Sequence, residues 1–404
     1  MKALFTTQPG IGHLLPMLAI AQALQQQGHE VRFATARSFG PTVAAYGFAA
    51  IAAGLDWLEA HAVRTFPEME DMTAAEQGDW LLSDIFADVA AHRMIPDLIA
   101  ICREWRPDVI VRNDFEFASC IVAELLDIPQ ATISISFFLS ASVLEPRIGE
   151  QLAYLRSMHG LSPYPALDML YPYLYLVLAP STFQPRELPV MHGIRPTPVG
   201  ADEAVPAWCH QLAAQPTVYA SMSSVYRGTN VFPNILAGLR DEPINLILTI
   251  GRGQDPAQFG PQPPNVRIEQ FIPQAALFPY CDLFITHNPF FTITSALSYG
   301  LPLLMIPNGG ELWMGAMRSM ELGLGRVLRL PGQFAAFNSL VPEVAPHTIN
   351  SAVRDLLQSP HYRANTQSMR AEIQALPDAM YAVELLCDLA ASRSPIRAGV
   401  AASA

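Results

Sequence analysis

The sequence predicts an α/β protein with two doubly wound parallel sheets, and two observations carry this expectation. Short apolar segments alternate with helical ones from Lys2 to about Ala179, and a second such series starts at Pro216. Strands and helices that alternate at this spacing favour parallel sheets with right-handed crossovers. With 404 residues, 51% of them apolar and only 15% charged, the chain is long enough for two domains with substantial cores.

The first half begins with an apolar strand, a glycine-rich turn and a helix in which Leu14, Leu18, Ala21 and Leu24 recur at helical spacing. Gly28 ends that helix as a C′ glycine. Later strands are expected at 30–36, 48–54, 107–114 and 129–136, and helices at 39–47 and 117–127. Residues 57–100 are expected to be helical but less regular.

The second half has expected strands at 216–224, 244–253, 266–272, 282–287 and 301–307. The proline-rich, poorly periodic stretch from Ala179 to Glu203 places the domain boundary near residues 200–214. We therefore predict domains at 1–205 and 206–374, a last amphipathic helix at 375–392 and a disordered tail at 393–404.

Composition excludes several classes of function. A net charge of −12, with an isoelectric point near 5.3, disfavours binding to nucleic acid, and no basic run suggests an anionic membrane surface. The apolar start is too short for a signal peptide, and the longest apolar stretches are too short for a bilayer span, so we expect a cytoplasmic protein. Five scattered cysteines favour free thiols in a reducing compartment over zinc ligands or disulfides.

The segment GIGHLLP, Gly10–Pro16, follows the first strand and opens the first helix. It is not a dinucleotide-binding fingerprint, because Leu15 replaces the third glycine and Arg37, not an acid, ends the second strand. His13 has the chemistry of a general base, since a neutral imidazole near pH 7 can take a hydroxyl proton. A purely structural His13 at a helix start is the alternative.

Asp114 lies just past the apolar strand segment DVIVRN, at 108–113, on the same carboxyl edge of the sheet as His13. A carboxylate there could orient the imidazole and stabilise its protonated form. It could also cap the helix that follows, and the two roles are compatible.

Residues 265–325 contain strand ends that would converge beyond the carboxyl edge of a second sheet, at Phe271–Gln274, His287–Thr292 and Asn308–Leu312. This order and spacing, together with Gly10–Pro16, resemble the GT-B glycosyltransferases of natural products, in the UDP-glycosyltransferase-like superfamily. The resemblance covers nearly the whole chain. It implies two Rossmann-like domains that face a cleft, with the last helix crossing back to the N-terminal domain.

The resemblance also implies roles for individual residues. His13 would be the general base and Asp114 its orienting acid. Phe271 would stack on the base of the nucleotide, Ile272 would contact the edge of that base, and His287 and Thr292 would hold the diphosphate. The full set of expected donor-site residues is Gly12, Ser223, Ser224, Phe271, Ile272, Gln274, His287, Asn288, Phe291, Thr292, Glu311 and Leu312.

Several positions depart from the family pattern, among them Ser223 for a glycine, Phe271 for a tryptophan and Glu311 for an aspartate. Asn288 and Pro289 stand where the family has two glycines, and they predict a helix that caps itself, with Asn288 as N-cap and Pro289 at N1. Such a helix would offer fewer N–H donors to a phosphate. Leu312 replaces a residue that hydrogen-bonds to sugar hydroxyls, which suits a deoxygenated sugar or no sugar at all.

We therefore expect an inverting glycosyltransferase that moves a hexose, especially a deoxyhexose, from a UDP- or dTDP-sugar to a hydroxyl of an apolar small molecule. The acceptor pocket would draw on 57–94 and 137–175, although plain core packing also explains their composition.

No Asp-x-Asp pair is present, so neither metal nor cofactor is expected. The chain would be a monomer or homodimer. Two alternatives stay open: a non-catalytic relative that has lost the diphosphate site, and a transferase for an unusual donor or a non-sugar group.

Overall fold

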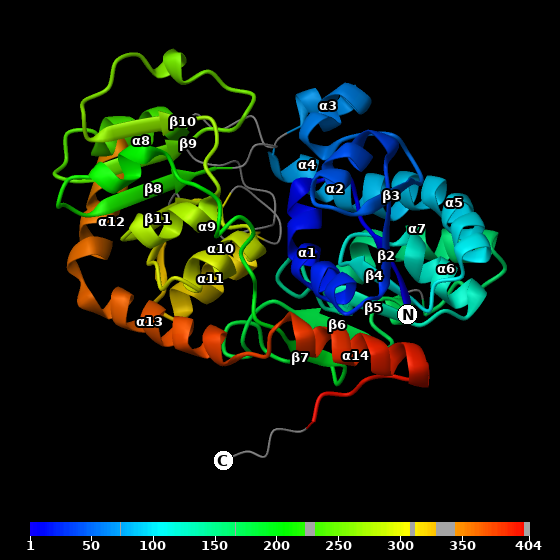
Figure 1. The fold of residues 1–404 in the computed structure, drawn as a ribbon. Coiled ribbons are helices and arrows are strands. Elements are labelled where there is room, and N and C mark those ends of the chain that lie inside the picture. Colours follow the sequence, from blue (N-terminus) through cyan, green and yellow to red (C-terminus); the bar gives the residue numbers. More distant parts are fainter. Residues whose placement is uncertain (73, 166, 223–230, 308–311, 329–343, 400–404) are drawn as a thin grey trace. The chain divides into compact units, whose positions relative to one another are not determined.

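A computed structural model of the chain describes residues 1–72, 74–165, 167–222, 231–307, 312–328 and 344–399. The chain forms two compact units, Met1–Met72 with Glu76–Thr197 and Leu376–Ala404, and Pro198–Ala375 with Thr73–Ala75. The two sheets are seen in Figure 1. The predicted donor residues Ser223, Ser224 and Glu311 lie outside the described residues.

The first unit has a seven-stranded, wholly parallel sheet, as the strand–helix alternation predicted. Its strand order is β3-β2-β1-β4-β5-β6-β7. The strands are β1 (Lys2–Thr6), β2 (Glu30–Thr35), β3 (Ala49–Ala52), β4 (Val109–Asn113), β5 (Gln130–Ile133), β6 (Leu174–Val177) and β7 (Met191–Gly193). Strands β1, β4 and β5 are buried on both faces except at Lys2, as expected inside a parallel sheet that helices cover on both sides.

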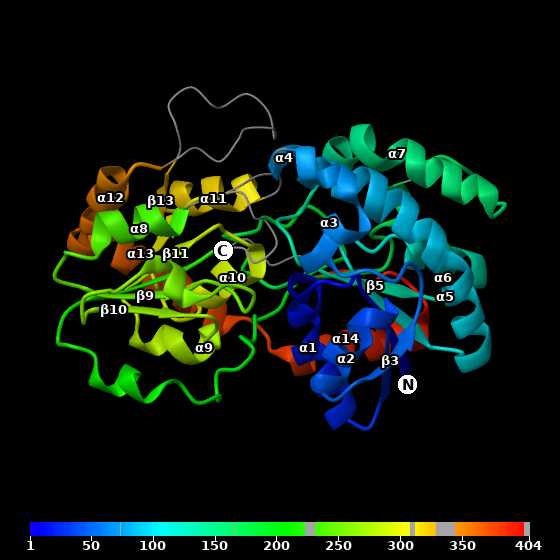
Figure 2. The same ribbon diagram turned by 90° about the horizontal axis from the view of Figure 1, so that it is seen from above.

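Helices cover both faces of this sheet. Figure 2 shows α1 and α14 grouped on one face and α5, α6 and α7 on the other. The helices are α1 (Ile11–Gln26), α2 (Gly40–Ala45), α3 (Ala62–Thr65), α4 (Ala74–Trp80), α5 (Ala91–Trp105), α6 (Ala118–Leu126), α7 (Ala141–Met158) and α14 (Ala379–Ser392).

The irregular stretch expected at 57–100 has a structural cause. Two short 3₁₀ segments, η2 (Glu59–His61) and η3 (Pro67–Asp71), flank α3. A π-helical segment, η4 (Leu81–Ala90), then lies between α4 and α5. The wider π-helical turn shifts side chains off the 3.6-residue period, so no single helical repeat fits this part of the sequence.

The second unit has a six-stranded parallel sheet with the order β10-β9-β8-β11-β12-β13. Its strands are β8 (Thr217–Ser221), β9 (Asn245–Thr249), β10 (Val266–Glu269), β11 (Leu283–Thr286), β12 (Leu303–Met305) and β13 (Gly325–Val327). Its helices are α8 (Val231–Leu239), α9 (Gln274–Leu277), α10 (Phe290–Leu297), α11 (Leu312–Glu321), α12 (Pro346–Gln358) and α13 (Pro360–Ala375). The helices α8 and α12 pack side by side over a core of Val, Ile and Leu side chains (Figure 2).

The C-terminal segment differs from the expectation of disorder from residue 393. The N–H of Ile396 donates to Tyr173 O (2.8 Å), and the N–H of Ala398 donates to Pro189 O (2.9 Å). Because these backbone groups find partners near β6 and β7, residues 393–399 are ordered against the first unit. Residues 400–404 lie outside the described part of the chain.

In each unit the strand order reverses once beside the first strand of the unit. The reversal lies between β1 and β4 in the first unit and between β8 and β11 in the second. Ligands of open parallel sheets bind beyond the carboxyl ends of strands at such switch points. His13 and Asp114 follow β1 and β4, and His287 follows β11, so the sequence placed its principal candidates at these points.

Candidate active site

His13 lies in the first turn of α1, so the segment Gly10–Pro16 opens this helix as the sequence indicated. The helix begins at Ile11 because Gly10 takes an extended N-cap conformation and its carbonyl accepts from the N–H of His13 (3.1 Å). The buried imidazole then points its Nδ1 at Asn113 Oδ1 (3.5 Å) and its Nε2 at Glu59 Oε1 (3.6 Å). The exposed Gly12 precedes it in the same turn.

Asp114 is buried, and its carboxylate accepts from donors on β6 and in the loop after β5. Tyr175 Oη donates to Oδ1 (2.8 Å), while Oδ2 accepts from the N–H groups of Ile135 (2.8 Å) and Ser136 (3.3 Å) and from Ser136 Oγ (3.3 Å). Burial raises the pKa of Asp114, although these donors and Arg112 oppose the rise. The contacts given for this carboxylate thus hold together the loops after β4 and β5.

The capping role considered for Asp114 is wrong. Helix α6 begins at Ala118, and its N-cap is Phe117, which makes no side-chain cap bond. Glu116 is the carboxylate that meets this helix end, because its Oε1 accepts from the N–H of Ser119 (3.1 Å). Its other oxygen accepts from Thr6 Oγ1 (2.6 Å), which ties the start of α6 to β1.

Replacement of Asp114 by Asn should therefore destabilise the first unit. The amide would place an NH₂ group where Asp114 now accepts donors, and a buried donor left without an acceptor costs about 1–3 kcal/mol. We expect a lower melting temperature for Asp114→Asn in a thermal denaturation scan. Asp127→Asn, at an 89% exposed carboxylate, is the matched control. Equal melting temperatures for Asp114→Asn and wild type would contradict this structural role.

Arg112 organises the same loop and was not singled out from the sequence. Its fully buried guanidinium donates through Nη1 to the carbonyls of Asn113 (2.7 Å), Asp114 (3.3 Å) and Glu116 (2.9 Å), and through Nη2 to Leu170 O (2.9 Å). A charge-bearing side chain inside an apolar strand pattern is the signal that could have found it, because such groups are buried only when paired.

Aromatic rings border His13. The His13 ring meets Phe86 edge-on at 5.5 Å between centroids and Phe115 at 6.1 Å, and Phe86 and Phe115 stack at 6.1 Å. Trp57 and Phe66 continue the cluster. Part of the range 57–94 therefore packs as a buried, apolar aromatic wall beside His13.

In the second unit, Phe271 is half exposed and follows β10 by two residues. Arg252 was missed by the sequence reasoning. Its guanidinium carbon lies 3.9 Å from the centroid of the Phe271 ring, so it covers one face of that ring. Ile272 is buried, and Gln274, the first residue of α9, hydrogen-bonds to the buried Tyr219.

His287 follows β11 and is held as a neutral imidazole. Burial lowers its pKa to about 4, and a hydrogen bond to the backbone of Ser221, at the end of β8, opposes this only in part. Within the described residues, the buried Nδ1 atom has no hydrogen-bond partner. A buried polar atom without a partner at a switch point makes this ring a candidate ligand contact.

This lowered pKa predicts an acid sensitivity. The pKa of His287 is near 6.5 in the unfolded chain and about 4 in the folded one. Between these pH values the unfolded chain therefore binds a proton that the folded chain does not bind. His287 then contributes full stability above about pH 6.5 and loses it as the pH falls towards 4, with a total loss of about 3 kcal/mol. Urea denaturation of wild type and His287→Gln from pH 7.5 to 4.5 measures the difference, and parallel stability curves would contradict the shift.

The predicted self-capping of the second-unit helix is wrong. Helix α10 starts at Phe290 with Pro289 as its N-cap, and no side-chain cap bond is made. Asn288 has a positive φ of 77° and turns its amide away from the helix, so that Nδ2 donates to Leu312 O (2.8 Å) at the start of α11. The N–H of Ile293 donates to Pro289 O (3.0 Å).

The start of α10 affects phosphate binding in two opposite ways. The first turn of α10, with the half-buried Phe291 and Thr292, precedes the first intrahelical bond and keeps donors for an anion. Asn288 Oδ1, however, is a buried acceptor with no partner among the described residues, and an acceptor repels an anion. Leu312 is placed beside this loop through its carbonyl contact with Asn288.

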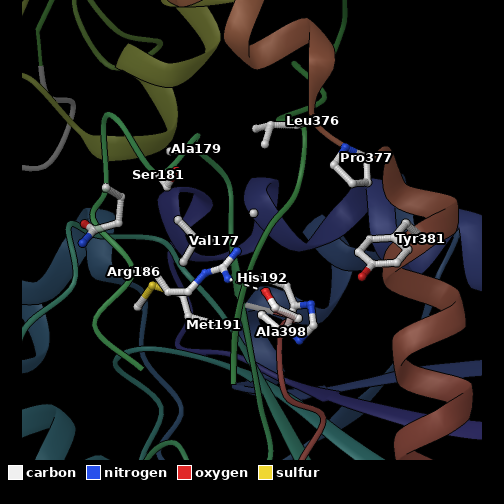
Figure 3. A pocket seen from close by; sticks show the side chains of 13 residues that line it. Val177, Ala179, Ser181, Arg186, Met191, His192, Leu376, Pro377, Tyr381 and Ala398 are labelled. Atoms are coloured by element: carbon white, nitrogen blue, oxygen red, sulfur yellow. Dashed lines mark hydrogen bonds between the residues drawn. The ribbon is translucent and has the colours of Figure 1, made fainter. Parts of the chain in front are cut away.

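A separate cavity of about 290 Å³ lies within the first unit, between β6, β7 and the segment at the start of α14 (Figure 3). Arg186 and His192 reach into it among apolar side chains, and Tyr381 faces it from α14. None of its lining residues is a predicted site residue, so we do not assign it to the active site.

Across the described residues, no three His, Cys, Asp or Glu side chains gather in a way that could hold a metal ion. In the same part of the chain, no helix combines the length and apolar character that crossing a membrane requires.

Comparison with known proteins shows the family. Residues 22–151 match the N-terminal domain, and residues 234–389 the C-terminal domain, of the erythromycin biosynthesis protein CIII-like family. The 4'-demethylrebeccamycin synthase of Lentzea aerocolonigenes is 27% identical over 95% of this chain and 98% of its own length. The 3-alpha-mycarosylerythronolide B desosaminyl transferase of Saccharopolyspora erythraea is 24% identical over 97% and 99%.

Solved structures agree on the fold. The glycosyltransferase VinC, in complex with dTDP, superposes with a TM-score of 0.77 at 24% identity, covering 97% of this chain and 100% of that one. Spinosyn rhamnosyltransferase SpnG gives a TM-score of 0.78 at 22% identity, covering 96% and 100%. The fold expected from the resemblance is thereby confirmed. With both family domains present in order along two Rossmann-like units, this chain belongs to the erythromycin CIII-like GT-B glycosyltransferases of antibiotic biosynthesis.

Proposed function

We propose that this glycosyltransferase inverts the anomeric centre as it moves a hexose, in particular a deoxyhexose, from a dTDP- or UDP-sugar to a hydroxyl of an apolar natural product. One observation carries the proposal: a buried imidazole, that of His13, lies at the switch point of the first sheet beside an apolar aromatic wall. A base in such a place meets an acceptor hydroxyl where water is largely excluded.

Each unit has its own part in this proposal. Residues 1–205 would bind the acceptor and residues 206–374 the donor, with the helix at 375–392 packed on the first unit. In the transfer, His13 accepts the hydroxyl proton as the acceptor oxygen bonds to the anomeric carbon and the nucleoside diphosphate leaves. His287, Thr292 and the first turn of α10 stabilise the leaving diphosphate without a metal ion.

The names of relatives support this choice of donor and acceptor. VinC was solved with dTDP, and several relatives are named as transferases of deoxysugars, such as the desosaminyl transferase of Saccharopolyspora erythraea. Leu312, in the place of a sugar-binding polar residue, favours a sugar that lacks hydroxyls, because an apolar side chain leaves no polar group unpaired beside a deoxygenated carbon.

A non-catalytic role is the second candidate, and one observation favours it. Asn288 Oδ1 is a buried acceptor beside the proposed diphosphate site, where it opposes an anion. A chain that kept the fold and lost donor binding would still bind an apolar small molecule. The two candidates differ in whether a nucleoside diphosphate binds.

A transfer assay tests the proposed reaction. The purified chain is incubated with dTDP- and UDP-hexoses and deoxyhexoses and with a set of macrolide and aromatic aglycones that carry free hydroxyls. We expect mass spectrometry to detect a new glycoside and NMR to show the anomeric configuration opposite to that of the donor. A product that retains the donor configuration would contradict the mechanism.

Phe271→Ala should weaken nucleotide binding. Stacking of a base on an aromatic ring is worth about 1–3 kcal/mol, which corresponds to roughly a tenfold to hundredfold loss of dTDP affinity. Phe271→Tyr is the matched control, since it keeps the ring that both the base and Arg252 contact. Equal affinities of Phe271→Ala and wild type in calorimetry would remove Phe271 from the donor site.

A further inference from the structure

The protonation pattern of the His13 ring is set by hydrogen bonds that converge on Asn113. The N–H of Phe115 donates to Asn113 Oδ1 (3.0 Å), and Asn113 Nδ2 donates to Thr7 Oγ1 (3.0 Å). Because a backbone N–H only donates, it identifies Oδ1 as the amide oxygen. An amide oxygen only accepts, so His13 Nδ1, 3.5 Å from Oδ1, carries the proton in this contact. In the neutral ring, which carries one proton, Nε2 is then the nitrogen that can accept a second proton.

A carboxylate faces that second nitrogen. Glu59 Oε1 lies 3.6 Å from His13 Nε2, and the two side chains are only 17% and 6% exposed, so solvent screens the pair weakly. Glu59 is anchored by its own N–H, which donates to Pro9 O (3.1 Å) in the loop after β1. Gly10 leaves the space that this carboxylate occupies, because a Cβ at residue 10 would overlap Glu59 Oε2.

We propose that Asn113 and Glu59 are the residues that prepare His13 as a base. Asn113 selects the tautomer with Nδ1 protonated, and Glu59 stabilises the imidazolium that forms when Nε2 takes a proton. Both are positioning residues, and the role expected of Asp114 at the ring passes to them. The inference rests on the proposed function of His13.

The transfer step involves only the acceptor hydroxyl, the donor sugar and His13. The acceptor O–H bond breaks and its proton goes to His13 Nε2. The oxygen bonds to the anomeric carbon, while the bond from that carbon to the diphosphate oxygen breaks and leaves its electron pair on the nucleoside diphosphate. Glu59 stays ionised and takes no proton. The long contacts of 3.5 and 3.6 Å fit a site without substrate, since catalytic hydrogen bonds tighten in the substrate complex.

Other charged groups on the elements around His13 have contacts of their own. Asp114 is held by Tyr175 and the loop after β5, and Arg112 by four backbone carbonyls. Glu116 is held by Thr6 and Ser119. Segment η4, which carries Phe86, also has Asp84, which is exposed, and Asp88, which is half-buried. Because these groups stay in place in each variant, the effect of Glu59 on the titration of His13 is the difference between Glu59→Gln and wild type.

NMR of the histidine-¹⁵N-labelled full chain tests both parts without any donor or acceptor. The His13 signals are assigned by their loss in His13→Gln. At pH values where the His13 ring is neutral, we expect the wild-type ring to carry its proton on Nδ1 and none on Nε2. In Asn113→Ala the Nε2–H tautomer should gain population. A resting wild-type ring with the proton on Nε2 would overturn the role of Asn113, whether or not that variant folds.

The same spectra followed against pH test Glu59. A nearby opposite charge favours the protonated ring, so Glu59→Gln should lower the midpoint of the His13 titration by about one pH unit or more, a tenfold change in its protonation equilibrium. Glu68→Gln, at an exposed residue of η3, is the charge-matched control. An unchanged midpoint in Glu59→Gln would overturn the role of Glu59.

Activity separates this inference from the function on which it rests. If the inference holds, the pH at which kcat/KM rises should move down in Glu59→Gln along with the NMR midpoint. Loss of turnover in His13→Ala without any change of pH profile in Glu59→Gln would refute the positioning role alone. Retained turnover in His13→Ala would refute the proposed function alone, even with both NMR results as expected.

Discussion

His13→Ala should lower kcat by about 10²–10⁴, the usual range for loss of a general base. The acceptor hydroxyl would have to lose its proton to water, which the buried, aromatic surroundings of His13 largely exclude. The dissociation constant for dTDP should barely change, because His13 belongs to the unit that the proposal assigns to the acceptor. Steady-state kinetics together with calorimetry measure the two effects.

A matched control makes this prediction specific. His92→Ala removes an exposed imidazole from α5 in the same unit and should leave kcat unchanged. A melting temperature equal to that of wild type would show that His13→Ala is folded. A folded His13→Ala with wild-type kcat on a verified acceptor would exclude His13 as the base.

The double variant Asn288→Gly with Pro289→Gly should bind nucleoside diphosphates more tightly than wild type. The change removes the buried acceptor Asn288 Oδ1, restores an N–H at residue 289 and opens space for the phosphates. Charge-assisted hydrogen bonds to an anion make the expected gain about 1–3 kcal/mol, or roughly tenfold to hundredfold in Kd.

The same variant should melt at a lower temperature without ligand. The bond from Asn288 Nδ2 to Leu312 O is lost, and a glycine in place of Pro289 adds entropy to the unfolded chain. The positive φ of 77° at residue 288 suits glycine and limits the loss. Pro289→Ala is the control that restores the N–H alone. Equal dTDP affinity in wild type and the Gly-Gly variant would show that Asn288 does not obstruct the donor site.

Much of the fold was predictable because its signals are local. Parallel strands buried on both faces, such as β4 and β8, read as apolar runs, and the alternation with helices fixes both sheets as parallel. The placement of His13, Asp114 and His287 at strand ends followed from the same pattern, since carboxyl ends of parallel strands meet at one edge.

What could not be predicted depends on tertiary contacts. Nothing near Glu59 in the sequence links it to His13, which it meets only because the η2 segment folds back over the loop after β1. The self-capping error has a similar cause. Asn and Pro are both favoured at helix starts, but the bond to Leu312 turned the Asn288 side chain towards α11 and moved the cap to Pro289.

A calorimetric titration of the wild-type chain with dTDP and UDP tests the central claim most directly. A competent glycosyltransferase of this design should bind one of them at a single site, with a Kd roughly between 1 μM and 1 mM, the range of most enzyme substrates. Phe271→Ala and His287→Gln should both weaken that binding, because the two side chains are proposed to meet the base and the diphosphate. Absence of saturable binding of either nucleotide to the folded chain would contradict the account and favour the non-catalytic alternative.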